Sequence, residues 1–494
     1  MQTEENQNTE PVDIPPVTGP FAEPWSLKKI MALAAVFGPA AIVASVSIGA
    51  GETIVVVRAG AWAEYNLLWL VLLSCVVKAV FVTYLLGRYT AVSGEYIGNR
   101  LAKLPGPRGW LLIAIVIFEM VGAPLAWVPI AKPCGALLHF LFRDTLSSGI
   151  AQPVWENLIT SCFITLALLF GLRISFEKLE KQQLIICAIL VVGTIIGTLM
   201  VRPDFGKALV GSLRFGYLPE FPEWAPKDAV ENPLLTMATA FGYVGGSVMG
   251  YVVYANWVSM HRWGMTSHSN IESIRQRAGN SDKIDYLPEH PEQVSQLRKI
   301  LAPLRWDIGM GAVVLFIVTG AFMISGAAVL YGTQSTFEGW SLLTDQASVW
   351  KNIHASLVWV YYICIIVALW GTLQALPEIY ARVMQEFFQA IWPHREWNYG
   401  TLRKWICLYI FLTTMVLIWL NIPFDILTQI AGFILANFSI ALVMLAALYL
   451  NAKLPAAYRT RPFMFIGALV SAAVLVTFAG ISGWGLFLKL FAGN

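Results

Sequence analysis

Apolar residues along this chain gather into long runs that short polar connections separate. A helix needs about 20 apolar residues to cross the roughly 30 Å hydrocarbon core of a bilayer. Eleven runs have about this length. The pattern therefore predicts an all-α membrane protein with about 11 transmembrane helices, near residues 31–57, 62–86, 110–131, 154–172, 182–201, 233–260, 308–332, 354–380, 404–421, 424–450 and 462–490.

Basic residues are distributed unevenly among the connections. If the N-terminus lies in the cytoplasm and the helices alternate, the cytoplasmic connections carry more than twice as many Lys and Arg residues as the external ones. Such an excess marks the cytoplasmic side of a membrane protein. We therefore expect a multi-pass protein of the plasma (inner) membrane, with a cytoplasmic N-terminus and an external C-terminus.

The polar stretches predict how the chain is divided. The N-terminal residues are polar, acidic and contain prolines, and they lack the basic start and early apolar run of a signal peptide. The prolines after the fifth run predict an ordered, non-helical external loop. The predicted parts are a disordered cytoplasmic tail (1–27), a first five-helix repeat (28–201), the external loop (202–232), a second five-helix repeat (233–450) with a cytoplasmic connector (261–307), and an eleventh helix (451–494).

Composition agrees with a chain that lies mostly in lipid. Hydrophobic residues make up 57% of the sequence and charged residues only 13%, whereas a soluble domain has about 25% charged residues. The net charge of +3 comes from basic residues scattered between the runs, so we expect no nucleic-acid partner. The six cysteines lie far apart without a C-x-x-C pair, which disfavours a disulfide framework or a zinc site.

The first and the sixth runs carry glycines midway along their length. Glycine loosens a helix, and the freed backbone groups survive in a membrane only where they line a cavity or bind a ligand. In a single spanning helix, small residues more often mark close helix packing. Two interrupted helices at corresponding positions of two five-helix halves instead favour a substrate site. The breaks contain Gly49, Ala50 and Gly51 in the first run and Gly242, Gly245, Gly246 and Gly250 in the sixth.

Two acidic residues lie within the apolar runs. Glu52 directly follows the first break, and Glu119 lies in the third run. A carboxylate in the bilayer interior costs about 3 kcal/mol or more unless it is paired, so both are functional candidates. Glu52 is either a ligand of the substrate or half of a structural ion pair with Arg58 or Lys78. Glu119 is either a proton relay or a hydrogen-bonding group between helices, and the sequence gives these two interpretations equal weight.

The motifs of the first two runs, in the order GP-x7-SIGAGE-x6-AG-x4-YNLLW, resemble the first two helices of the Nramp divalent-metal transporters. In that family an Asp-Pro-Gly-Asn break precedes Ala-Gly and Tyr-x-Leu-Leu-Trp. The sixth-run motif GGSVMGY resembles the family's Ala-Thr-Val-Met-Pro-His, the third-run motif EMVG its Glu-Val-x-Gly, and Thr428-Gln429 its Ser-Gln. The resemblance implies a leucine-transporter-type fold of two inverted five-helix repeats, with discontinuous helices 1 and 6.

The resemblance also implies a metal site between the two breaks. Gly49 stands at the family's metal-binding Asp, Glu52 at its Asn, and Gly246 at the Ala whose carbonyl faces the metal. Met249 stands at the thioether ligand, and Gln429 stands at a position that joins the site in some states. The implied metal ligands are therefore Glu52, Met249, Gly49, Gly246 and Gln429, so one carboxylate is kept but at a different position.

The residues that the family uses for proton movement are only partly kept. Tyr251 replaces the sixth-helix His and Val116 replaces the third-helix Asp, whereas Glu119 is retained. Glu119 and Glu52 are therefore the candidates for a proton pathway, and proton coupling is an open expectation.

These observations predict a secondary-active transporter of divalent metal ions that works by alternating access. A thioether beside a carboxylate suits Mn²⁺ or Fe²⁺ better than Ca²⁺ or Mg²⁺, although Mg²⁺ stays a further candidate. The metal is the transported substrate, and neither a resident cofactor nor an enzymatic activity is expected. The alternatives are a transporter of the same fold for a small organic cation or an amino acid, with Tyr243, Tyr251 and Tyr254 lining a wider pocket, and a sensor that binds without transport.

Overall fold

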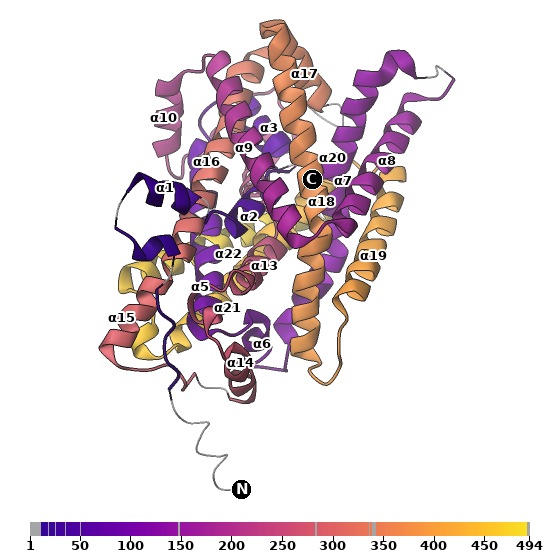
Figure 1. The fold of residues 1–494 in the computed structure, drawn as a ribbon. Coiled ribbons are helices and arrows are strands. Elements are labelled where there is room, and N and C mark those ends of the chain that lie inside the picture. The colour runs from indigo at the N-terminus through magenta and orange to yellow at the C-terminus, as the bar shows by residue number, and fades with distance from the viewer. Residues whose placement is uncertain are drawn as a thin grey trace.

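The computed structural model of the chain describes residues 11–491, except residues 18, 25, 35, 50, 147–148, 282–283, 335 and 338–341. In this part the regular elements are helices, without a strand. Nine of its helices are long and apolar enough to cross a membrane, or ten if the bent first run counts as one span, whereas the apolar runs predicted about eleven. Figure 1 shows the arrangement of these helices. They are α4–η3–α5 (Leu68–Ser93), α7 (Trp110–Phe142), α8 (Gln152–Arg173), α9 (Phe176–Met200), α16 (Ala302–Leu330), α18 (Ala355–Ile391), α19 (Tyr399–Trp419), α20–η7–α21 (Phe424–Lys453) and α22 (Pro462–Phe491).

The first and sixth apolar runs form discontinuous helices. The first contains α2 (Pro39–Ser47), followed by the π-helical turn η2 (Gly51–Val55) and α3 (Val56–Ala63), and the two halves are bent by 47°. The sixth contains α12 (Pro233–Tyr243) and α13 (Val248–Met260). This confirms the predicted breaks, although Ala50 lies outside the described residues.

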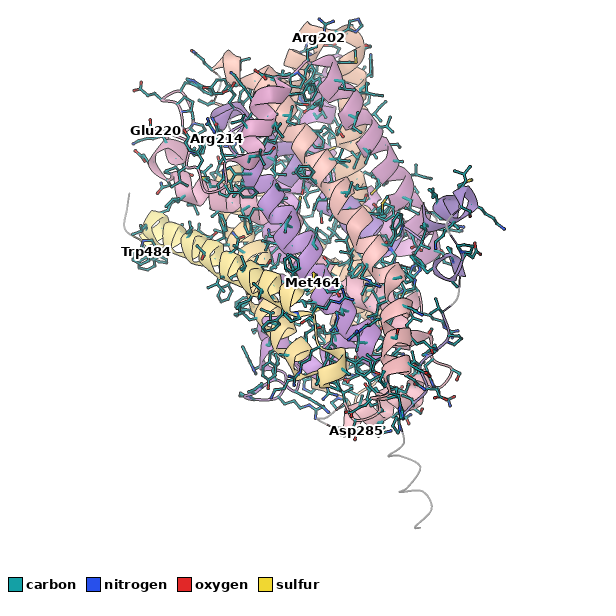
Figure 2. The ribbon with its side chains drawn as sticks, turned by 90° about the vertical axis from the view of Figure 1, so that its left-hand side faces the viewer. Arg202, Arg214, Glu220, Asp285, Met464 and Trp484 are labelled. Atoms are coloured by element: carbon teal, nitrogen blue, oxygen red, sulfur yellow. The ribbon has the colours of Figure 1, made fainter. Side chains whose placement is uncertain are left out.

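The helices around the two breaks come from both halves of the sequence. Helix α16 packs against α2, α3 and α9, and α18 packs against α2, α7, α8, α9 and α13. Helix α7 also contacts α20 and the π-helical stretch η7 (Gly432–Phe438). Figure 2 shows α22, which carries Met464 and Trp484, lying across the outside of this bundle. The breaks are therefore enclosed by α7, α16, α18 and η7.

The two long polar stretches lie at opposite ends of the bundle, because Figure 2 places Arg202 and Asp285 far apart along its length. The stretch after α9 contains two short helices, α10 (Phe205–Leu213) and α11 (Lys227–Glu231). The expectation of a non-helical loop was therefore wrong. Asp204 explains the start of α10, because its side chain accepts a hydrogen bond from the backbone N–H of Lys207.

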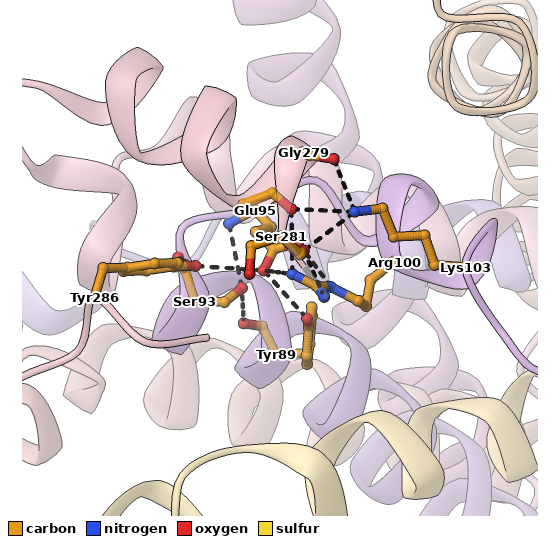
Figure 3. A network of polar contacts seen from close by, with 9 residues as sticks. Tyr89, Ser93, Glu95, Arg100, Lys103, Gly279, Ser281 and Tyr286 are labelled. Atoms are coloured by element: carbon orange, nitrogen blue, oxygen red, sulfur yellow. Dashed lines mark hydrogen bonds and ion pairs between the residues drawn. The ribbon is translucent and has the colours of Figure 1, made fainter. Parts of the chain in front are cut away.

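The connector between α13 and α16 is fixed to the helix bundle by hydrogen bonds. It contains α14 (Ile271–Asn280) and α15 (Pro291–Ile300). Tyr286 of the connector donates to the carbonyl O of Ser93 at 2.7 Å. The ion pair of Glu95 and Arg100, also 2.7 Å, belongs to the same network, which Figure 3 shows. Lys103 donates to the carbonyl O of Gly279 at 2.8 Å. This end of the protein therefore has a layer of polar side chains that hydrogen bonds and an ion pair hold in place.

Part of the predicted N-terminal tail has a defined position on the same connector. The backbone N–H of Val12 donates to the carbonyl O of Tyr286 at 2.8 Å. Ile14 is 5% exposed, and its carbonyl O accepts from the Gln296 side chain at 2.7 Å. Residues 1–10 lie outside the described residues.

Candidate functional site

The break between α12 and α13 is made by two glycines in the left-handed region. Gly245 has φ +93° and Gly246 has φ +80°, conformations that residues with a Cβ atom rarely adopt. A Cβ atom on Gly245 would also lie 2.5 Å from the Oη atom of Tyr251. The sequence therefore ends the helix at this point, and the last carbonyl groups of α12 are left without helical partners.

The side chains of Lys78 and Ser74 donate hydrogen bonds to these carbonyl groups. The Nζ atom of Lys78 lies 2.6 Å from the carbonyl O of Phe241, 2.7 Å from that of Gly242 and 3.1 Å from that of Val244. One helical turn earlier, the hydroxyl of Ser74 donates to the carbonyl O atoms of Phe241 and Val244. Both side chains are fully buried. The end of α12 is thus closed by an ammonium group and a hydroxyl group.

The break between α2 and η2 places a carboxylate beside the same point. Glu52 is fully buried, and its Oε1 atom accepts from the backbone N–H of Gly245 at 3.2 Å. Its Oε2 atom has no hydrogen-bond partner in the described part of the chain. Lys78 is the charged group that interacts electrostatically with Glu52. The structure therefore joins Glu52 to the break in the sixth run by a hydrogen bond and places a basic residue in its electrostatic range.

The two breaks touch each other directly. A Cβ atom on Gly51 would lie only 2.7 Å from the carbonyl O of Tyr243, so this contact requires a glycine. The hydroxyl of Ser47, at the end of α2, donates to the carbonyl O of Gly245 at 2.9 Å. Tyr251 donates to the same carbonyl O. Both breaks therefore form one continuous polar centre in the interior of the bundle.

A cavity of about 100 Å³ borders this centre. Backbone atoms of both breaks line it, together with small residues of η7 and the side chains of Thr372, Leu376 and Ile379. Three aromatic residues, Trp127, Tyr243 and Tyr380, also line it, whereas none of its lining residues is ionisable as an acid, a lysine, an arginine or a histidine. The cavity walls are thus mainly apolar, with backbone, hydroxyl and indole groups as their polar parts.

The structure brings only some of the predicted site residues to this cavity. Gly49 and Gly246 line it, whereas Glu52 and Met249 are fully buried and are not among its lining residues. The described residues contain no group of three or more His, Cys, Asp and Glu side chains that could hold a metal ion. In this conformation, the cavity therefore offers a metal backbone and hydroxyl oxygens, and the Glu52 carboxylate lies outside its lining.

Gln429 does not line the central cavity and lies instead in a second cavity of about 70 Å³. Its amide nitrogen donates to Asp228 at 2.7 Å, and its amide oxygen accepts from Lys489 at 2.9 Å. In the same cavity Arg58 forms an ion pair with Asp425 at 2.7 Å. These charged contacts join four helices: α11 of the stretch after α9, α3, α20 and α22.

Glu119 lies behind the aromatic wall of the central cavity. Its Oε2 atom accepts from the hydroxyl of Tyr380 at 2.8 Å, and it lies near the backbone N–H of Met249. The ring of Tyr380 packs edge-on against Trp127, with 6.1 Å between the ring centroids. The structure therefore links Glu119 to the cavity through Tyr380, which is the arrangement of a hydrogen-bonding group between α7 and α18.

Of the tyrosines that the sequence analysis named for a wider pocket, Tyr243 lines the cavity, whereas Tyr251 and Tyr254 do not. Sequence reasoning missed the other aromatic residues of the lining. Trp127 and Tyr380 are ordinary members of apolar runs, and no motif distinguishes them. Lys78 was considered only as a partner for Glu52, although a lysine in the middle of LWLVLLSCVVKAVFVTYLL signals a buried acceptor group nearby. A further signal is local: the segments Gly51–Val55, Cys75–Val82 and Gly432–Phe438 are π-helical, and such bulges are frequent at functional sites.

Comparison with known proteins gives the family. The sequence pattern of the family described as "Natural resistance-associated macrophage protein-like" (Nramp) matches residues 40–485, which is most of the chain. The chain belongs to the Nramp family. The predicted resemblance is thereby confirmed over nearly the whole helical part.

Two curated Nramp relatives carry the name divalent metal cation transporter MntH. The relative from Latilactobacillus sakei is 25% identical over 305 residues, covering 61% of this chain and 56% of the relative. The relative from Mycobacterium tuberculosis is 25% identical over 308 residues, covering 60% of this chain and 58% of the relative. The matches therefore span less than two thirds of the relatives' own length.

Solved structures confirm the fold expected of an Nramp protein. The Eremococcus coleocola manganese transporter, in complex with an aromatic bis-isothiourea compound, superposes with a TM-score of 0.66 at 13% identity, covering 93% of this chain and 88% of that one. MhsT in complex with L-phenylalanine superposes with a TM-score of 0.52 at 13% identity, covering 90% and 98%. The predicted leucine-transporter-type architecture is thus confirmed.

Proposed function

We propose that this Nramp-family chain is a secondary-active transporter that moves a divalent metal ion by alternating access. One observation carries the proposal: the two interrupted helices meet at Glu52 and Gly245, where a buried carboxylate contacts freed backbone groups. Interrupted helices at the interface of two repeats form the substrate sites of such transporters. The names of the curated relatives support a divalent metal as the substrate.

In this proposal Glu52 supplies the anionic ligand through its Oε2 atom, which has no hydrogen-bond partner in the described residues. The backbone at Gly49 and Gly246, which lines the central cavity, supplies neutral oxygens. Met249 adds a thioether and favours Mn²⁺ or Fe²⁺ over Ca²⁺. Gln429 joins only after it leaves Asp228 and Lys489, and therefore belongs to a different state of the transport cycle.

The remaining expectations extend the same proposal. We place the chain in the plasma membrane with its N-terminus and the connector in the cytoplasm, supported by the distribution of basic residues. We also propose the division into two five-helix repeats and an eleventh helix, which rests on the positions of the apolar runs and on the family resemblance. Glu119 and Glu52 are the groups proposed to carry protons if transport is proton-coupled.

A second candidate function rests on the lining of the central cavity. Trp127, Tyr243 and Tyr380 surround a space without an ionisable side chain, and the Tyr243 hydroxyl has no partner in the described residues. Aromatic faces attract organic cations, and mainly apolar pockets with a few polar groups bind small organic molecules. A small organic cation or an amino acid is therefore the alternative substrate.

Uptake into proteoliposomes separates the two functions. The purified protein is tested with Mn²⁺ and, in parallel, with a panel of amino acids and quaternary amines, with protein-free liposomes as the control. We expect concentrative Mn²⁺ uptake that Glu52→Gln abolishes and Trp127→Phe leaves largely unchanged. Uptake of an organic compound that Trp127→Phe impairs, without Mn²⁺ uptake, would replace the metal assignment with the second one.

A further inference from the structure

Lys78 lies where a lysine is most costly, in the middle of the α4–η3–α5 helix and fully buried. A charged side chain at this depth of a membrane protein costs about 3 kcal/mol or more unless its surroundings compensate. Its π-helical segment, Cys75–Val82, places the side chain against the broken end of α12. A charged Lys78 at this position therefore needs compensating groups, and the end of α12 provides them.

The partner is a group of oxygens that suits a positive ion. Lys78 reaches the carbonyl O atoms of Phe241, Gly242 and Val244 within 3.1 Å. A protonated amine has three N–H bonds, one for each of these acceptors, so the geometry suits the ammonium form. The ring of Phe241 also faces the ammonium, with 4.6 Å from Nζ to the ring centroid. The group at this point is therefore a cation with a single positive charge.

The same oxygens would form an ion site without the lysine. The C-terminal end of a helix carries a partial negative charge, and the unwound carbonyls of discontinuous helices coordinate monovalent ions. The Ser74 hydroxyl adds a fourth oxygen within 3.0 Å of the carbonyls of Phe241 and Val244. Glu52, whose Oε1 atom accepts a hydrogen bond from Gly245, interacts electrostatically with Lys78, so its carboxylate form would supply one compensating negative charge.

We propose that the end of α12 is a binding site for a monovalent alkali cation, and that the ammonium of Lys78 fills it permanently. Lys78 is then a specificity-determining residue: it excludes free ions from the α12 carbonyls and leaves the space beside Gly246 to the substrate. Replacing the lysine by an uncharged side chain opens the site to Na⁺ or K⁺. This inference goes beyond the proposed function, because it holds whichever substrate is transported.

The test compares Lys78→Met with Lys132→Met. Lys132 is also buried, in α7, but its ammonium donates to the Asn421 side chain at 2.6 Å and, at 3.4 Å, to the carbonyl O of Ile418 near the end of α19, not to the break between α12 and α13. Each protein is purified in detergent, and its Tm is measured in NaCl, KCl and choline chloride at equal ionic strength. For Lys78→Met we expect a Tm about 5 °C higher in at least one alkali chloride than in choline chloride. The wild type and Lys132→Met should show no such difference.

Two double variants distinguish ion binding from the loss of a structural contact. Glu52→Gln/Lys78→Met removes the compensating carboxylate, and Ser74→Ala/Lys78→Met removes the hydroxyl oxygen. The alkali-dependent rise in Tm should disappear in the first and shrink in the second. A Lys78→Met protein that survives purification in alkali chloride but not in choline chloride also supports the proposal.

Other outcomes overturn it. If Lys78→Met has the same Tm in all three salts, or is lost in all of them, a free cation does not take the place of Lys78. The same conclusion follows if the wild type shows the same alkali dependence as the variant, or if Mn²⁺ alone stabilises the variant. None of these results depends on Mn²⁺ uptake by the wild type. Failure of this proposal can therefore be distinguished from failure of the proposed transport function.

Discussion

The two interrupted helices of this Nramp protein are broken in different ways. At the α12–α13 break two glycines turn the chain, and Lys78 and Ser74 saturate the carbonyls that are released. At the α2–η2 break none of the described residues 48, 49 and 51 has a positive φ, and the chain continues through a π-helical turn. One oxygen of Glu52 there has no hydrogen-bond partner in the described part of the chain.

The difference indicates that the two breaks have different roles. At the end of α12 the side chains of Lys78 and Ser74 saturate the free carbonyls, so this break is held in one conformation. The first break keeps an unsatisfied carboxylate oxygen and is held mainly at the start of α2, where Asp307 of α16 accepts from the backbone N–H groups of Gly38 and Ala40. We therefore expect substrate binding to depend on Glu52 and stability to depend on Asp307, Gly245 and Ser74.

The largest expected effect on stability is that of Asp307→Ala. Its buried carboxylate accepts from Gly38 at 3.0 Å, from Ala40 at 2.9 Å and from the Tyr254 hydroxyl at 3.0 Å. Its removal leaves three buried donors without an acceptor and should cost about 3–4 kcal/mol. The thermal unfolding of the purified protein in detergent measures this loss. Asp307→Asn, which keeps one acceptor oxygen, should lose less, and equal Tm values for the wild type and Asp307→Ala would remove the proposed anchor.

Gly245→Ala should have the next largest effect, about 2–3 kcal/mol. Alanine disfavours the left-handed conformation, and its Cβ atom would collide with Tyr251. Gly250 is the matched control, because it lies in α13 and an added Cβ atom there meets nothing within 4 Å. Gly250→Ala should leave the Tm unchanged or raise it slightly. Equal losses in both variants would show that the break at Gly245 does not need its conformation.

Ser74→Ala should have a smaller effect, about 1 kcal/mol. The variant loses a hydroxyl that donates to two carbonyls of α12, while Lys78 still reaches both of them. A loss of Tm close to that of Asp307→Ala would mean that Ser74, rather than Lys78, closes the helix. The Tm losses of Ser74→Ala and Lys78→Met, compared in the same buffer, therefore rank the contributions of the two side chains to stability.

The sequence predicted the architecture because its signals are local. Apolar length and helical spacing define the spanning helices, and the glycine clusters define the two discontinuous ones. It could not identify which of the four glycines in the sixth run adopt a positive φ. Gly245 and Gly246 do, whereas Gly242 and Gly250 lie within helices. The position of the break depends on the contacts of the α12 carbonyls and of Tyr251, which form only in the folded chain.

The side-chain geometry of the site was less accessible to sequence reasoning. Gln429 was placed near the metal by resemblance, whereas its contacts to Asp228 and Lys489 join a loop and a helix distant in the sequence. Such long-range pairs leave no periodic pattern. Met249 lies at the start of α13, but the direction of its side chain follows from how α13 packs against α5 (Thr83–Ser93) and α18. The roles of these residues stay predictions.

The central claim, that Glu52 binds a divalent metal at the junction of the two breaks, is tested most directly by calorimetric titration of the purified protein with Mn²⁺. Glu52→Gln keeps the shape of the side chain and removes its charge, and Glu119→Gln is the control, because its carboxyl group contacts Tyr380 instead. We expect the affinity of Glu52→Gln to fall at least about tenfold and that of Glu119→Gln to stay close to the wild type. Unchanged Mn²⁺ affinity in Glu52→Gln would contradict the account.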